Sequence, residues 1–178
     1  MIERFVEWAA NAGWIIERND EPISFPEGVL ARYKNIPEEW LSFIGNFKDI
    51  RNAAENVWFL TDYSFADTQT YFEDISIDGA AGDDAWIQEI KKFWDKTLPI
   101  VMDVGGDYHY FAIDLETGEV VEGWEPEFEY PYVKAGSFNG LSTFRPIMPK
   151  RILRYLASRN PRPPTIMPIM PLAPLWTR

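Results

Sequence analysis

One histidine and three aspartates lie close together in the sequence and could in principle bind a metal ion. They are Asp103, Asp107, Asp114 and His109, the single histidine of the chain. In an extended strand Asp107 and His109 share one face, and Phe111 and Ile113 continue that face. A histidine in apolar company is typical of a buried side chain that makes one hydrogen bond. The sequence therefore predicts no metal site.

Carboxylates and a serine that could serve in catalysis are present, but their positions favour other roles. The adjacent pairs Glu38/Glu39 and Asp83/Asp84 stand where helices are predicted to begin, which favours capping. Ser137 lacks the glycine-flanked turn of a nucleophilic serine. A catalytic triad would also have to recruit the single histidine from elsewhere in the fold.

Glycines at 105 and 106 do not form a phosphate-binding loop, because neither of the spacings that cradle phosphates is present. They predict a turn instead. We therefore expect no catalytic residue, no cofactor and no enzymatic activity. An enzyme with an unrecognised site is the alternative.

Charge is strongly segregated along the chain, whose formal net charge is -11. Residues 1–133 hold all 28 acidic residues and 9 of the 17 basic ones, whereas residues 134–178 hold 8 basic residues and no acidic one. An acidic body repels nucleic acids and anionic membranes and attracts cationic protein surfaces. The expected partner is a cationic protein, with no nucleic acid or membrane bound directly.

Neither cysteine nor a membrane-spanning segment is found in the sequence. Disulfides and thiolate metal sites are thereby excluded. No apolar run approaches the roughly 20 residues that cross a bilayer, and acidic residues occupy the N-terminus where a signal peptide would be apolar. A cytoplasmic location is expected.

Three helices are predicted from apolar residues at helical spacing. Their apolar positions are Ile2, Phe5, Val6 and Ala9, then Trp40, Leu41, Ile44 and Phe47, then Trp86, Ile90, Phe93 and Trp94. The first helix is expected to end near Gly13, the second to begin at Pro37, and the third to be capped by Asp83 or Asp84. Residues 20–28 contain two prolines and a glycine and predict a loop.

Strands are predicted at residues 57–61, at residues 70–77 and in a block from Leu98 to residue 121. Within the block, side chains alternate over residues 108–115, and Gly118 closes a tight hairpin. Helices come first, strands cluster later, and the links are short. The sequence therefore predicts an α+β fold with a mostly antiparallel sheet flanked by helices.

Three motifs in a fixed order carry a resemblance to a known family. They are the segment from Ile36 to Ile44, which begins Ile36-Pro37-Glu38-Glu39-Trp40, the strand and turn block from Leu98 to Val121, and Ala135-Gly136-Ser137-Phe138. Together they resemble the signature of the SUKH superfamily, which includes fungal Smi/Knr-like cell-wall regulators and many bacterial immunity proteins. After residue 138 the chain departs from the family, which usually continues into an acidic helix. The resemblance implies a SUKH-like domain over residues 1–145.

Residues 146–178 differ from the rest and predict a basic helix followed by a proline-rich tail. The helix carries Lys150, Arg151, Arg154 and Arg159 opposite an apolar side of Ile152, Tyr155 and Leu156. In the tail, Pro168, Pro171 and Pro174 repeat every third residue, the period of polyproline II. We expect these prolines and Trp176 to dock on an aromatic surface of this chain or of a second copy, with the basic segment attracted to the acidic body. There are two alternatives: the tail has no fixed structure, or this end of the chain arose by a frameshift and has no evolved role.

The resemblance implies a non-catalytic immunity protein of bacterial type that binds and neutralises a protein toxin, for example a nuclease, of a polymorphic or contact-dependent toxin system. A nuclease site is cationic because it holds phosphates, so an acidic surface can cover it. The expected contact residues are Asp78, Asp83, Asp84, Glu125, Glu127 and Glu129. An intracellular scaffold or regulatory adaptor is the alternative.

Overall fold

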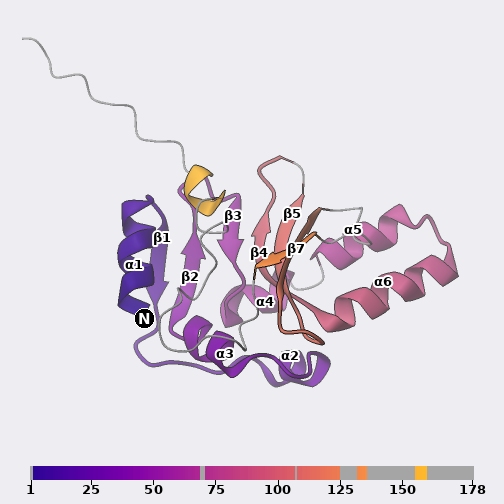
Figure 1. The fold of residues 1–178 in the computed structure, drawn as a ribbon, viewed down its shortest axis with the longest axis horizontal. Coiled ribbons are helices and arrows are strands. Elements are labelled where there is room, and N and C mark those ends of the chain that lie inside the picture. Colours follow the sequence, from indigo (N-terminus) through magenta and orange to yellow (C-terminus); the bar gives the residue numbers. More distant parts are fainter. Residues whose placement is uncertain (1, 69–70, 107, 125–131, 136–154, 160–178) are drawn as a thin grey trace, which may run out of the picture.

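The computed structural model describes residues 2–68, 71–106, 108–124, 132–135 and 155–159. Within these residues seven strands form one antiparallel sheet, in which each strand pairs with its neighbours along the chain (Figure 1). The strands are β1 (Ile15–Arg18), β2 (Phe47–Arg51), β3 (Val57–Phe59), β4 (Thr97–Asp103), β5 (His109–Asp114), β6 (Val120–Trp124) and β7 (Tyr132–Ala135). The helices are α1 (Ile2–Asn11), α2 (Glu27–Arg32), α3 (Glu38–Ile44), α4 (Asp62–Thr68), α5 (Tyr71–Gly79) and α6 (Asp84–Lys96). The predicted α+β class with an antiparallel sheet is confirmed.

One face of the sheet is covered by α1 and by the helical residues 155–158. Phe59 on β3 and Phe111 on β5 lie on this face, because both are register partners of Val101 on β4. Phe5 of α1 packs edge-on against Phe59 with ring centroids 5.7 Å apart, and Tyr155 packs against Phe111 at 5.4 Å. Burying such rings is worth roughly 2–3 kcal/mol each and fixes the elements that carry them.

Helices α5 and α6 form a hairpin that packs on the opposite face. Tyr110 alternates with Phe111 along β5, and its ring lies 5.1 Å from Trp94 of α6 and 5.7 Å from Phe72 of α5. Figure 1 shows that the two helices meet the sheet at one end and extend away from it at the other. The sheet therefore holds the base of the hairpin and leaves its far end outside the core.

Most of the predicted helix boundaries are confirmed. Phe5 and Ala9 form the buried side of α1, and Gly13 follows it with a φ of 75° that suits glycine. Pro37 stands at the N-cap of α3, and Asp83 caps α6. The loop predicted for residues 20–28 covers residues 19–26, and α2 begins at its end.

Two predicted elements are wrong. Residues 70–77 were expected to be extended, but residues 71–79 form α5, in which Phe72 and Ser76 stand one helical turn apart and are buried. Phe47 was expected on the buried side of the second helix, but α3 ends at Ile44, and Phe47 begins β2. Phe47 remains fully buried, so its apolar character was interpreted correctly and its element was not.

The strand block of residues 98–121 is confirmed. β4 and β5 pair from Thr97 with Asp114 to Asp103 with His109, and Gly118 takes a φ of 74° in the link to β6. The Asp114 carboxylate accepts hydrogen bonds from the amides of residues 116 and 117 at 2.8 and 3.2 Å. Asp114 is therefore a turn-forming residue.

Replacing Gly45 with alanine is expected to lower the free energy of unfolding by about 1–3 kcal/mol, because a Cβ there would collide with the backbone oxygen of Ile23 and press on that of Leu41. Gly28→Ala in α2 is the matched control. A Cβ at Gly28 meets nothing within 4 Å, so this change should stabilise the protein by up to about 1 kcal/mol. Urea denaturation of both variants measures the difference, and equal effects would contradict the close approach at Gly45.

Candidate interaction surface

The far end of the α5–α6 hairpin gathers three of the predicted contact residues. Asp78 lies in the last turn of α5, Asp83 is the N-cap of α6, and Asp84 is its first residue. The turn between the helices is tight, since the amide of Ala81 donates to the carbonyl of Asp78 and the amide of Asp83 donates to that of Ala80. We call Asp78, Asp83, Asp84 and Trp86 the hairpin tip. Its three aspartates are exposed.

Asp83 is held in one orientation by the helix that follows it. One carboxylate oxygen accepts hydrogen bonds from the amides of Ala85 at 3.0 Å and Trp86 at 3.1 Å. This capping satisfies two of the free amides at the start of α6 and places a negative charge at the positive end of the helix dipole. The capping role and the predicted contact role therefore use the same exposed carboxylate.

Trp86 adds a large apolar surface to the hairpin tip. Its side chain is 40% exposed, whereas Ile90 and Trp94 on the same helix are buried. Sequence spacing assigned all three to one buried stripe. The prediction is wrong for Trp86, because the part of α6 that carries it extends beyond the sheet (Figure 1).

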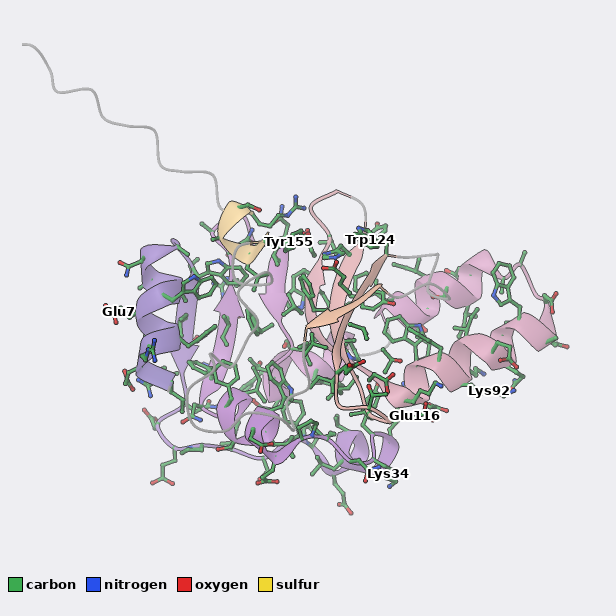
Figure 2. All side chains as sticks on the ribbon, viewed as in Figure 1. Glu7, Lys34, Lys92, Glu116, Trp124 and Tyr155 are labelled. Atoms are coloured by element: carbon green, nitrogen blue, oxygen red, sulfur yellow. The ribbon has the colours of Figure 1, made fainter. Side chains whose placement is uncertain are left out.

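Helix α6 carries three lysines, Lys91, Lys92 and Lys96, and two of them form ion pairs within the described residues. Lys92 pairs with Glu89 at 2.7 Å, and Lys96 pairs with Glu116 of the β5–β6 link at 3.0 Å (Figure 2). In the part of the chain that the structure describes, none of the three tip aspartates forms an ion pair. The tip therefore presents uncompensated negative charge next to an exposed indole.

The other predicted contact residues fall outside the described ranges. Those residues are Glu125, Glu127 and Glu129, together with Pro168, Pro171, Pro174 and Trp176 of the tail. The structure therefore brings together Asp78, Asp83 and Asp84 and leaves the remaining positions as predictions. Glu38 and Glu39 lie in the first turn of α3 and are not part of the hairpin tip.

A second polar cluster lies on the opposite face, where β4 ends. Asp103 is 1% exposed and forms a bidentate ion pair with Arg159. The Nε atom of Arg159 lies 2.7 Å from Oδ2 of Asp103, and Nη2 lies 2.9 Å from Oδ1. Asp103 also accepts hydrogen bonds from the Tyr155 hydroxyl at 2.5 Å and the Gly105 amide at 2.9 Å. Burial alone would raise the pKa of Asp103, but these hydrogen bonds outweigh it and hold that pKa below its ordinary value. Arg159 of the predicted basic segment thus pairs with an acidic residue of the body, whereas Lys150, Arg151 and Arg154 lie outside the described residues.

His109 lies beside Asp103 and is also buried. It pairs with Asp103 across β4 and β5 and with Trp124 across β5 and β6, and its ring lies 4.7 Å from those of Trp124 and Tyr155. Figure 2 shows Tyr155 and Trp124 at the same end of the sheet. The side chain is 3% exposed, and neither ring nitrogen has a hydrogen-bond partner among the described residues. The predicted burial is confirmed, and the predicted hydrogen bond is not found among the described residues.

The structure separates the residues that the sequence suggested as metal ligands. Asp114 and Asp103 mark opposite ends of the β4–β5 pair, and Asp107 is outside the described ranges. Over the described residues, no group of three or more histidine, aspartate or glutamate side chains is placed to hold a metal ion. The same residues contain no helix of the length and apolar character that crossing a membrane requires.

Comparison with known proteins returns no match to this chain from family models, from curated proteins or from solved structures.

Proposed function

We propose that this chain is a non-catalytic, SUKH-like protein-binding domain that acts as an immunity protein, and that the α5–α6 hairpin presents its tip to a cationic protein toxin. The observation that carries the proposal is the exposed Trp86 flanked by Asp83 and Asp84 at the end of a hairpin whose base is packed on the sheet. Net charge of -11, with the basic residues concentrated after residue 133, supports a cationic partner.

The two components of the hairpin tip have different physical roles. Uncompensated aspartates attract a cationic surface over roughly a Debye length, about 8 Å at physiological ionic strength, and so raise the association rate. The indole of Trp86 supplies apolar area that is desolvated only after contact, which slows dissociation. Because α6 is fixed by Ile90 and Trp94, little conformational entropy is lost when the tip is bound.

Removing the three charges should slow association without weakening the helix. In a variant carrying Asp78→Asn, Asp83→Asn and Asp84→Asn, asparagine at 83 keeps the N-cap while the charges are lost. We expect the association rate constant with the toxin to fall about 10-fold at low salt and its salt dependence to flatten. Stopped-flow association at several salt concentrations is the measurement.

The matched control changes the same net charge elsewhere. Glu7, Glu21 and Glu38 are exposed and lie outside the hairpin, so the triple glutamine variant should associate at nearly the parental rate. Trp86→Ala should leave association unchanged and weaken binding about 30-fold through faster dissociation.

The toxin can be obtained by affinity capture from the native host and then tested for toxicity. Expression of this chain should protect cells that produce the captured protein, and the asparagine variant should protect them less. Protection that is unaffected by both the asparagine variant and Trp86→Ala would refute the hairpin tip as the contact. A captured partner without toxicity would favour the adaptor function instead.

A further inference from the structure

His109 belongs to a row of side chains across the sheet on which residues 155–159 are docked. Val57, Asp103, His109 and Trp124 lie in register across β3 to β6. Residues 155–159 cover this row, with Leu156 fully buried and Tyr155 contacting both Asp103 and His109. Asn52 adds a weak hydrogen bond to the backbone oxygen of Arg159 at 3.4 Å. The segment is therefore docked through the Asp103 carboxylate, the buried Leu156 and the ring of Tyr155, which packs against Phe111 and His109.

The charges around His109 come from three elements. Asp103 lies on β4, Arg159 and Tyr155 lie on the docked segment, and Glu122 lies on β6, where its charge acts on Tyr155. Val57 and Trp124, the remaining members of the row, are uncharged. A proton on His109 would thus be attracted by Asp103 and repelled by Arg159.

Asp103 can satisfy only one of two cations. In the docked form its two oxygens accept from Arg159, Tyr155 and Gly105, so no orientation is left for a donor from His109. Side chains directly opposite in an antiparallel pair have Cβ atoms about 4.5–5.5 Å apart, which is within reach of a direct bond after a side-chain rotation. Protonated imidazole donates from both nitrogens, whereas a buried imidazolium without an acceptor is strongly disfavoured.

We propose that Asp103 is the shared anchor of a proton-operated latch: it holds residues 155–159 on the sheet through Arg159 and Tyr155 while His109 is neutral, and it binds the His109 imidazolium and releases the segment when His109 is protonated. The latch lies on the face opposite the α5–α6 hairpin. It does not depend on the proposed toxin contact.

The direction of the pH dependence follows from the two protonation states of His109. Burial, the main cause, and Arg159 lower its pKa to about 4 in the docked form, although Asp103 opposes them. An exposed histidine has an ordinary pKa of about 6.5, so the released form binds the proton more tightly. Docking is therefore strongest above pH 6.5 and weakens progressively as pH falls toward 4. Asp103, whose pKa is lowered by docking, acts in the same direction only at still lower pH.

A spin label on the full chain can report release directly, because the chain contains no native cysteine. Ala157 is exposed and lies within the docked segment, so Ala157→Cys supplies the labelling site. We expect an immobilised label at pH 7.5 that becomes mobile between pH 6.5 and 4. A label at Ser42→Cys on α3 and the far-UV circular dichroism should stay unchanged over that range. A label at residue 157 that stays immobile down to pH 4 would overturn the latch.

Two variants separate the latch from general acid sensitivity. His109→Phe keeps an aromatic ring among Phe111, Trp124 and Tyr155 without a titrating group, so its label should stay immobile at pH 5. Arg159→Ala should mobilise the label at pH 7.5 and raise the pKa of the single histidine toward 6.5, which NMR titration reads without assignment ambiguity. Arg18→Ala, an exposed arginine paired with Glu3, is the matched control and should change neither readout.

Each variant has an outcome that contradicts the latch. Release of the His109→Phe segment over the parental pH range would assign the effect to another group. An Arg159→Ala variant in which the pKa of His109 remains near 4 would show that docking of the segment does not control that histidine.

Discussion

Replacing Trp94 with alanine is expected to lower the free energy of unfolding by about 3–5 kcal/mol. Trp94 is 1% exposed and lies between Phe93, Phe72 and Tyr110, with ring centroids 5.0, 6.4 and 5.1 Å away. Its removal leaves a cavity where α6 meets both Phe72 of α5 and Tyr110 of β5. The hairpin would lose the packing that orients it, and the chemical denaturation midpoint should fall accordingly.

Trp86→Ala provides the matched control, because it removes the same side chain from the same helix at an exposed position. Its expected cost is below about 1 kcal/mol. The pair of variants also separates stability from binding, since Trp86→Ala should weaken toxin binding and Trp94→Ala should weaken the fold. Equal losses of stability in the two variants would contradict the arrangement of α6 on the sheet.

Replacing Arg32 with alanine is expected to cost about 3 kcal/mol, because it leaves the Glu73 carboxylate buried without a counter-ion. The guanidinium of Arg32 donates to Glu73 at 2.7 Å and to Asp95 at 3.1 Å, and the Glu73 side chain is only 8% exposed. This pair joins α2 to α5 and, through Asp95, to α6. Urea denaturation measures the loss.

The comparison for Arg32 is the exposed pair of Lys92 and Glu89, whose side chains are 68% and 66% exposed. Lys92→Ala should cost less than about 1 kcal/mol, because water screens that pair. Adding Glu73→Gln to Arg32→Ala should recover part of the loss, since the buried charge is then removed. If Arg32→Ala costs no more than Lys92→Ala, the buried pair does not stabilise the hairpin base.

The sequence predicts those elements whose burial pattern is set along one helix or one strand. Phe5 and Ala9 of α1, or Val120 and Val121 of β6, are buried by simple periodicity. Residues 70–77 were predicted to be extended, whereas residues 71–79 form α5. Its helical form depends on Phe72 stacking against Trp94, a contact with a partner 22 residues away that local propensity does not contain.

The sequence predicted the negative charge of the candidate site, but it did not predict that Trp86 is exposed there. The acidic character of residues 1–133 led to the prediction of Asp78, Asp83 and Asp84 as contacts, and the preference of aspartate for N-caps predicted Asp83 or Asp84 at the start of α6. The exposure of Trp86 was not predictable, because it depends on where the sheet ends beneath the helix. The contact between Asp103 and Arg159 joins residues 56 positions apart, and only the general attraction of a basic segment to an acidic body was predictable.

The neighbour-to-neighbour order of the sheet has a consequence for synthesis on the ribosome. Each strand from β2 onward pairs with the strand made just before it, so the sheet can grow in step with the emerging chain and needs no later strand to be inserted between earlier ones. Asp103 is the exception, because its carboxylate is placed early and meets its guanidinium partner only after 56 further residues have been made. Until then that aspartate must remain hydrated or take another cation, and the nearest ionisable base across the strand pair is His109.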